Sequence, residues 1–197
     1  DAQQKFAVVR SSRKGLLPSR HTLALARRIV AEKGVTRVVF GAMAPLGLLG
    51  PALREAGVET IVAMSQGHEA GWAMTPGLRQ ALRRIGESCD RVTYLTEYTR
   101  SKIAPALTAR AAGKMRQLAP GVDTAAFTPE RKEAAARLRA EFGLAGKPVI
   151  VCVSRLMQRK GQDRLIDAMP QIRAAVPDAT LVIVGKGSYG PTLEKLV

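Results

Sequence analysis

The sequence predicts an α/β fold built from parallel β-α-β units. Short runs rich in valine and isoleucine alternate with longer segments whose apolar residues recur every three or four positions. Helices that alternate with short strands in this way favour a parallel, doubly wound sheet. A Pro-Gly turn at positions 120 and 121 and a polar stretch after it separate two such series. We therefore expect two domains of the same kind.

The first series contains most of the elements of one such domain. Gly34 and Gly57 follow the first two helical patterns, where glycine readily takes the left-handed conformation that ends a helix. The expected helices are Ser19–Lys33, Leu46–Ala56, Pro76–Cys89 and Glu97–Ala111. The expected strands are Lys5–Arg10, Arg37–Gly41, Glu59–Met64, Arg91–Leu95 and Met115–Leu118.

The second series is shorter. It consists of a strand at Val149–Ser154, a helix at Gln162–Val176 closed by Pro177, a strand at Thr180–Val184 and the first turns of another helix. Two strands do not make a stable doubly wound sheet. We therefore expect the chain to be a piece of a two-domain protein.

The expected domain boundaries follow from these two series. Residues 1–118 form a nearly complete first domain, and residues 148–197 form the opening of a second, truncated one. Residues 119–147 form a linker with a short polar helix that ends at Gly143.

The net charge of +15 indicates an anionic partner, and residues 1–145 carry +11 of it. Nucleic acid, an acidic membrane surface and a phosphorylated substrate all fit the charge alone. The aromatic content of 4% offers no stacking platform for single-stranded nucleic acid, and no helix-turn-helix or zinc-finger pattern is present, so we expect no nucleic-acid partner. No apolar run spans a bilayer and no signal-peptide pattern occurs, which predicts a soluble globular protein, and the low cysteine content fits a reducing cytoplasm.

Cysteine and histidine are too sparse for a metal or disulfide scaffold. Cys89 and Cys152 are the two cysteines, and His21 and His68 are far apart in the sequence. We expect no structural metal.

The stretch VCVSRLMQRKGQDRL, residues 151–165, places Arg155, Arg159 and Lys160 between a buried strand and a helix. In a parallel sheet such a turn lies at the carboxyl end of the strand, where ligands bind, and the helix N-terminus adds partial positive charge. An anion is therefore the expected ligand. The alternative is that the three side chains are solvated surface charges in a basic protein.

The expected helix Pro76–Cys89 is amphipathic. Leu78, Leu82, Ile85 and Cys89 share one face, and Arg79, Arg83 and Arg84 lie away from it. Such a helix commonly packs its apolar stripe on the core and leaves its basic side in solvent. The same three arginines are candidate contacts to anionic lipid, and both roles are compatible if only the arginines touch headgroups.

The turn GKGSYG, residues 185–190, matches the G-x-G-x-x-G pattern of dinucleotide-binding proteins. This raises the alternative of an NAD(P)-dependent oxidoreductase. The turn follows the second strand of its domain instead of the first, however, and the acidic residue expected about 20 positions later would lie beyond residue 197. A plain glycine-rich turn is a further interpretation.

Four motifs together resemble family 4 of the retaining glycosyltransferases with the GT-B fold. They are GHEAGW (67–72), PGVDTAAFTP (120–129), VCVSRLMQRKGQDRLIDAMP (151–170) and LVIVGKGSYGPTLEKL (181–196). Within this family the sequence is most similar to the GDP-mannose-dependent mannosyltransferases that extend phosphatidylinositol mannosides in actinobacteria. The most specific part is S-R-L-x-x-R-K-G-x-D with the V-G-x-G that follows it.

The resemblance implies a fold of two Rossmann-like, doubly wound domains and an enzyme. Its reaction is the transfer of mannose from GDP-mannose to a phosphatidylinositol mannoside-type lipid, with retention and without a metal or other cofactor. Its implied partners are the nucleotide-sugar donor and an anionic inositol phospholipid, met peripherally at the inner face of the plasma membrane.

The resemblance also implies roles for particular residues. Arg155 and Lys160 bind the donor diphosphate, while Arg159 points to solvent, and Gly185 and Gly187 form a tight turn near the donor. In relatives the loop after a strand of the first domain commonly reads H-G-H-E. Here it reads Gln66-Gly67-His68-Glu69, which makes Gln66 and His68 the catalytic candidates, with Gln66 in place of the first histidine.

Two parts of the family pattern lie outside the sequence. A glycine-rich loop after the first strand would precede residue 1, and an E-x7-E arrangement that binds the donor would follow residue 197. We therefore expect this stretch alone to be inactive. The oxidoreductase and a basic module that binds an anionic surface or nucleic acid remain the alternatives.

Overall fold

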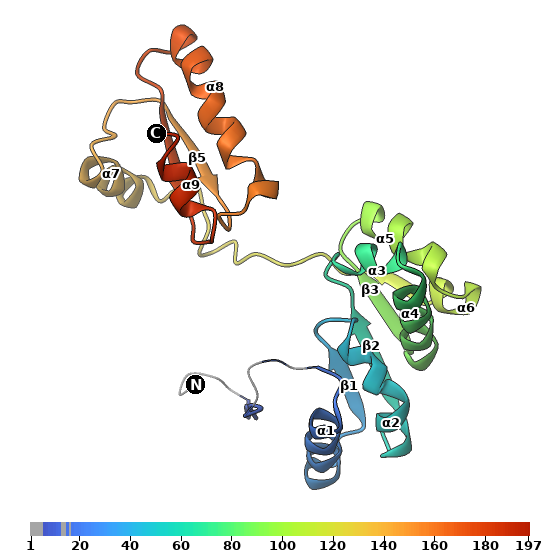
Figure 1. Cartoon of the computed structure of the whole chain (residues 1–197). Helices are drawn as coiled ribbons and strands as arrows, with labels where there is room; N and C mark the ends of the chain where they lie inside the picture. Colours follow the sequence, from blue (N-terminus) through green and yellow to red (C-terminus); the bar gives the residue numbers. More distant parts are fainter. Residues whose placement is uncertain (1–5, 13–14, 16) are drawn as a thin grey trace. The chain divides into compact units, whose positions relative to one another are not determined.

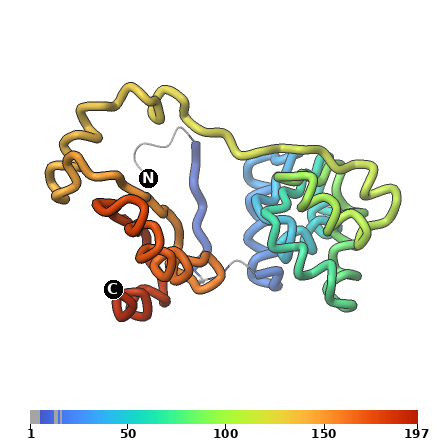
Figure 2. Tube along the Cα trace, turned by 90° about the horizontal axis from the view of Figure 1, so that it is seen from above, coloured from blue at the N-terminus to red at the C-terminus, as the bar shows by residue number. Residues whose placement is uncertain are grey.

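The computed structural model describes residues 6–12, 15 and 17–197. The chain divides into two compact units, Asp1–Gly121 and Val122–Val197 (Figure 1). Residues 118–131, yellow in Figure 2, form no helix or strand. Each unit is described separately below.

Unit 1 contains a four-stranded parallel sheet in the order β1-β2-β3-β4. Val38 lies opposite Ile61, Ala63 opposite Val92 and Thr93 opposite Arg116. The strands are β1 (Arg37–Phe40), β2 (Thr60–Met64), β3 (Arg91–Tyr94) and β4 (Met115–Gln117). The carboxyl ends of parallel strands share one edge, and the loops after β1 and β2 are therefore neighbours.

Helices α1 to α6 of the described residues accompany this sheet (Figure 1). Ser19, Thr96 and Thr108 cap three of them by accepting a hydrogen bond from a backbone N–H of the first turn. The helices are α1 (Arg20–Lys33), α2 (Gly50–Glu55), α3 (Glu69–Ala73), α4 (Pro76–Ser88), α5 (Glu97–Ile103) and α6 (Ala109–Gly113). The sequence pattern did not reveal α3, because five residues are too few to show a helical period.

The core of unit 1 lies between the sheet and the helices. Ile61 and Val92 from the strands and Leu82, Ile85 and Ile103 from the helices have no exposed surface. The apolar face expected for α4 is confirmed at Leu82, Ile85 and Cys89, whereas Leu78 is 38% exposed at the start of the helix.

Three expected elements of unit 1 differ in the structure. Residues 6–10 of the expected strand Lys5–Arg10 are not a strand, because no described strand pairs with them, and Lys5 lies outside the described residues. The expected helix Glu97–Ala111 is interrupted by a 3₁₀ turn at Ala104–Ala106, since Pro105 lacks a backbone N–H, and Thr108 then caps α6. The expected helix Leu46–Ala56 likewise begins as a 3₁₀ turn, Leu46–Leu49.

Unit 2 pairs two parallel strands, β5 (Val149–Val153) and β6 (Thr180–Val184). Its helices are α7 (Lys132–Glu141), α8 (Gln162–Ala175) and α9 (Gly190–Glu194). The polar helix expected in a linker is α7, and here it groups with unit 2. Val151 and Val153 are 59% and 73% exposed, and a hollow of about 670 Å³ separates α7 from this face of the strands.

None of the helices in the described part of the chain combines the length and the apolar character that crossing a bilayer requires.

Candidate functional site

Two loops of unit 2 meet at the carboxyl ends of β5 and β6. Ser154 N donates to Val184 O at 3.1 Å, Leu156 N to Lys186 O at 3.0 Å and Tyr189 N to Leu156 O at 3.3 Å. These bonds continue the pairing of the two strands into the connections that lead to α8 and α9. Backbone hydrogen bonds therefore connect the loop that carries the basic residues to the loop that carries the glycines.

The glycines of the second loop are required by the chain's own backbone. A Cβ at Gly185 would lie 1.9 Å from Ser154 O, and a Cβ at Gly187 would lie 2.1 Å from Leu156 O. In a dinucleotide fingerprint the second glycine leaves room for the pyrophosphate. At Gly187 that room is filled by Leu156, so the pattern of residues 185–190 has a structural explanation that needs no dinucleotide.

The basic residues lie in the other loop, in front of α8. Arg155, Arg159 and Lys160 are all exposed, and none forms an ion pair within the described chain. A 3₁₀ turn, Gln158–Lys160, leads to Gly161, whose φ of 72° starts the 14-residue helix α8, and no side chain caps it. The partial positive charge of this helix end adds to that of the side chains. Because all three side chains are exposed, exposure alone does not distinguish Arg159 from Arg155 and Lys160.

The sequence analysis missed Gln162, whose side chain forms hydrogen bonds with this loop. Its side chain is fully buried, and Nε2 donates to Ser154 Oγ at 2.8 Å and to Arg155 O at 3.0 Å. The available signal in the sequence was a polar residue directly after the glycine that precedes the expected helix. Gln162 thereby fixes the backbone that carries the Arg155 side chain.

A second side-chain bond links the same two loops. The Tyr189 hydroxyl donates to Asp163 Oδ2 at 3.2 Å. Burial and the neighbouring Asp163 carboxylate, which accepts this hydrogen bond, raise the pKa of Tyr189. The phenol therefore stays protonated at neutral pH and keeps donating to Asp163.

In unit 1 a buried carboxylate organises the loop after β2. Glu69 has no exposed surface, and its Oε2 accepts from Ser65 Oγ at 3.0 Å, Gln66 N at 3.1 Å and Gly67 N at 3.1 Å. Gly67 supplies the left-handed turn that these bonds need, with φ of 94°. The sequence analysis matched Glu69 to a motif, and the structure gives it this function in the loop.

The structure brings the two catalytic candidates of unit 1 together at the carboxyl edge of its sheet. Gln66 Nε2 donates to Gly41 O at 2.9 Å, and His68 Nε2 lies 3.1 Å from Ala44 O. Both exposed side chains are thus held against the loop that follows β1. One of the two amide hydrogens of Gln66 is engaged in this way, which leaves the other, and the carbonyl oxygen, for a ligand.

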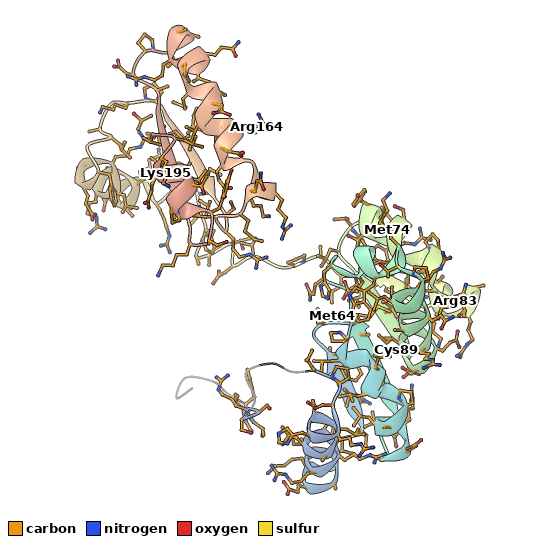
Figure 3. The ribbon with its side chains drawn as sticks, in the orientation of Figure 1. Met64, Met74, Arg83, Cys89, Arg164 and Lys195 are labelled. Atoms are coloured by element: carbon orange, nitrogen blue, oxygen red, sulfur yellow. The ribbon has the colours of Figure 1, made fainter. Side chains whose placement is uncertain are left out.

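The three arginines of α4 lie on the exposed side of the helix; Figure 3 marks Arg83 and, near the helix start, Met74. Arg79 Nη2 donates to Pro105 O, whereas Arg83 and Arg84 have no ion pair within the described residues. The neighbouring Glu87 is engaged elsewhere: hydrogen bonds from Arg110 and Thr108 lower its pKa. This surface therefore keeps its positive charge.

The described residues contain no group of three histidine, cysteine or acidic side chains that could hold a metal. Cys89 and Cys152 are both free thiols. Cys89 is buried at the end of α4, and this burial raises the pKa of its thiol.

Comparison with known proteins finds similarity along nearly the whole chain. Residues 134–197 match the family model "Glycosyl transferases group 1". The chain is 47% identical over 195 residues to the GDP-mannose-dependent α-(1-6)-phosphatidylinositol monomannoside mannosyltransferase of Mycolicibacterium smegmatis, covering 99% of this chain and 50% of that protein. It is 42% identical over 197 residues to the GDP-mannose-dependent monoacylated α-(1-6)-phosphatidylinositol monomannoside mannosyltransferase of Corynebacterium glutamicum, covering 100% of this chain and 51% of that protein.

Among solved structures, HepE of Anabaena in complex with UDP matches with a TM-score of 0.69 at 19% identity, covering 89% of this chain and 47% of that one. The chain therefore spans about half the length of the relatives and structures it matches.

Proposed function

We infer that this chain is part of a glycosyltransferase with the GT-B fold. The identity of 47% over almost the whole chain supports this inference most directly, and the parallel α/β architecture of both units agrees with it. The resemblance expected from the four sequence motifs is thereby confirmed.

We propose that the parent enzyme transfers mannose from GDP-mannose to a phosphatidylinositol mannoside-type lipid. The printed activities of the relatives from Mycolicibacterium and Corynebacterium support the donor and the class of acceptor. Unit 1 would face the acceptor, and unit 2 the nucleotide sugar.

In this proposal Arg155 and Lys160 bind the donor diphosphate. Breaking the sugar–phosphate bond builds negative charge on the departing diphosphate, and cations that are already in place stabilise that charge more in the transition state than in the ground state. The buried Gln162 supports the proposal, because it holds the Arg155 backbone in position before any ligand arrives.

We further propose transfer with retention and without an enzyme nucleophile. A carboxylate that attacks the sugar must reach it, but Glu69, the carboxylate of the loop after β2, is fully buried, and its Oε2 already accepts three hydrogen bonds. Gln66 and His68, both exposed on that loop, would contact the sugar or the acceptor through hydrogen bonds.

The acceptor surface is proposed to lie on α4. Arg79, Arg83 and Arg84 would contact anionic headgroups at the inner face of the plasma membrane, where the enzyme would bind peripherally. The engagement of Glu87 by Arg110 and Thr108 supports this, because no carboxylate among the described residues forms an ion pair with Arg83 or Arg84.

The test is a donor and acceptor assay on the full-length polypeptide that contains this chain. We expect radiolabelled mannose to pass from GDP-mannose to a phosphatidylinositol monomannoside, and GDP to compete with the donor. Transfer from UDP-glucose alone would contradict the proposed donor. Saturable NADH binding without any response to GDP would favour the oxidoreductase.

A further inference from the structure

One ring nitrogen of His68 forms a hydrogen bond with a backbone carbonyl and also lies beside a buried carboxylate oxygen. Nε2 lies 3.1 Å from Ala44 O and 3.4 Å from Glu69 Oε1. A backbone carbonyl oxygen can only accept a hydrogen bond, so Nε2 must supply the hydrogen. A neutral imidazole carries one hydrogen, and Nδ1 is then an acceptor with a free lone pair.

The ring that carries this lone pair is half exposed. The His68 side chain keeps 50% of its surface exposed, and Nδ1 has no hydrogen-bond partner among the described residues. The anchoring carboxylate, by contrast, is fully buried. Its Oε2 accepts three hydrogen bonds, while Oε1 accepts none from the described residues and lies 3.4 Å from His68 Nε2. The two oxygens of Glu69 therefore serve different purposes: one shapes the loop and the other is left for His68.

We propose that Glu69 and the Ala44 carbonyl fix His68 as the Nε2–H tautomer, so that Nδ1 accepts a hydrogen bond from a hydroxyl of the substrate. Glu69 acts as the positioning residue, and His68 is the residue that touches the ligand. The identity of the hydroxyl, on the donor sugar or on the lipid headgroup, rests on the proposed function; the tautomer does not. No proton needs to leave the hydroxyl in this arrangement, since a hydrogen bond alone orients it.

The tautomer is measurable on the 197-residue chain itself. With ¹⁵N-labelled histidine, the two ring nitrogens of each residue give separate resonances that identify which one carries the hydrogen. The chain has only two histidines, and His21, exposed on α1, provides an internal reference. In alkaline solution we expect His68 to show the shifts of a single Nε2–H tautomer, with His21 as the comparison in the same spectrum. Averaged shifts at His68, or an Nδ1–H ring, would overturn the proposal.

Two variants separate the carboxylate's effect on the ring from its effect on the loop. In Glu69→Gln the carbonyl oxygen should keep the place of Oε2, where three donors need an acceptor, and the amide NH₂ should then face Nε2. Two donors would oppose each other, and the single tautomer at His68 should be lost. Ser65→Ala is the matched control, because it removes one donor to Oε2 and leaves the His68 side of Glu69 untouched.

We expect Ser65→Ala to keep the Nε2–H signal. Equal disturbance of His68 in both variants would show that Glu69 acts only by shaping the loop. If circular dichroism shows that Glu69→Gln does not fold, Glu69→Asp replaces it. Aspartate keeps a carboxylate but is too short to approach the ring, so the proposal requires His68 to show both tautomers in that variant.

A second experiment tests whether Nδ1 contacts the substrate hydroxyl. In the full-length enzyme, His68 is replaced with Asn or with Gln, which places an amide near one or the other ring nitrogen. The amide of Asn lies near the place of Nδ1 and keeps an acceptor there, whereas that of Gln lies near Nε2 and keeps the bond to Ala44 O. We expect His68→Gln to lower kcat/KM roughly ten-fold more than His68→Asn, the size of one lost hydrogen bond.

The substrate whose KM rises identifies the source of the hydroxyl. A higher KM for GDP-mannose indicates the donor sugar, and a higher KM for the lipid indicates its headgroup. Equal losses in the two variants would overturn the acceptor role of Nδ1. A full-length polypeptide with no glycosyl transfer would refute the proposed function and the ligand assignment, while the ¹⁵N spectra still decide the tautomer independently.

Discussion

Among the residues, the three cations of the β5–α8 loop show how much depends on the backbone beneath a side chain. All three are exposed, but only Arg155 has its own carbonyl held by the buried Gln162. Lys160 directly precedes Gly161 and α8, where the helix end adds positive charge. Arg159 lies one position earlier in the same 3₁₀ turn and has neither feature.

The first prediction compares these cations in the full-length enzyme. Arg155→Ala or Lys160→Ala should lower kcat by roughly 100-fold or more, as for the loss of one preorganised donor that stabilises developing charge. Arg159→Ala is the matched control in the same loop and should have a much smaller effect. Small, equal effects in all three variants would favour the alternative interpretation, in which these side chains are solvated surface charges.

The second prediction concerns the glycines of the neighbouring loop. Gly187→Ala places a Cβ about 2 Å from Leu156 O, a backbone atom that cannot turn away, and should lower the free energy of unfolding of unit 2 by about 3 kcal/mol. Gly190→Ala in the same turn is the control, because its nearest neighbour is the end of the flexible Leu156 side chain at 3.3 Å. Urea unfolding followed by circular dichroism measures both. Equal stability would contradict the close backbone contact.

Among the elements, α4 combines a structural and a proposed binding role on opposite sides. Leu82, Ile85 and Cys89 are buried in the core of unit 1, which explains why the helix forms. That burial says nothing about the arginines on the other side, because the core would be satisfied equally well by any polar residues there. The charge that Arg83 and Arg84 retain is therefore a separate property of this surface.

The third prediction tests that charge. Replacing Arg79, Arg83 and Arg84 with Gln should weaken binding to phosphatidylinositol-rich vesicles by roughly two orders of magnitude at low salt, since each basic residue near an anionic surface contributes about 1 kcal/mol. Rising salt should erase the difference. Vesicle sedimentation measures the binding.

The matched control removes the same charge from another helix. Arg20, Arg28 and Lys33 are exposed on α1, and their replacement with Gln should leave vesicle binding largely intact. An equal loss in both triple variants would show that net charge, not the α4 surface, attracts the lipid. Displacement of the vesicles by duplex DNA, with a steep dependence on salt, would favour a nucleic-acid partner.

At the scale of the whole molecule, the two units differ in how much apolar surface they bury. Among the described residues, Ala179 and Leu193 are the only buried hydrophobic residues of unit 2, while the others form the core of unit 1. The valines of β5 remain largely exposed on one face. Because burial of apolar surface is the main favourable term in folding, unit 2 should be the less stable unit of this chain.

The fourth prediction uses the two cysteines, one in each unit, as reporters. Cys89 is buried, and its raised pKa lowers the thiolate fraction at neutral pH, so it should resist alkylation until unit 1 unfolds. Cys152, half-buried on β5, should react at lower urea. Mass spectrometry of alkylated peptides across a urea series gives both transitions. A single shared midpoint would contradict the difference in stability, and Cys89→Ser and Cys152→Ser control for the assignment of each reaction.

The pattern of apolar residues determined most of the elements on its own. Strands β1 to β6 and helices α1, α4 and α8 were predicted within one or two residues, because each has enough residues to show its period or lies between clear turn signals. The five-residue helix α3 and the break at Pro105 were missed, since the first is too short for a period and the second depends on how a proline is accommodated in a particular turn. Charge and spacing also predicted that the loop after β5 is basic and that the loop after β6 is rich in glycine.

The tertiary structure alone decided what the side chains of those loops do. Gln162, Glu69 and the two glycines at 185 and 187 have functions set by contacts that only the folded chain makes: with the carbonyl of Arg155, with the hydroxyl of Ser65 and with the carbonyls of Ser154 and Leu156. A sequence pattern records the order of residues along the chain, whereas a hydrogen bond or a steric contact depends on which backbone segments the fold brings within about 3 Å of one another. For this reason the sequence could place Arg155, Lys160, Gln66 and His68 in loops at the ends of strands, and only the fold could show which of them are held in place and by what.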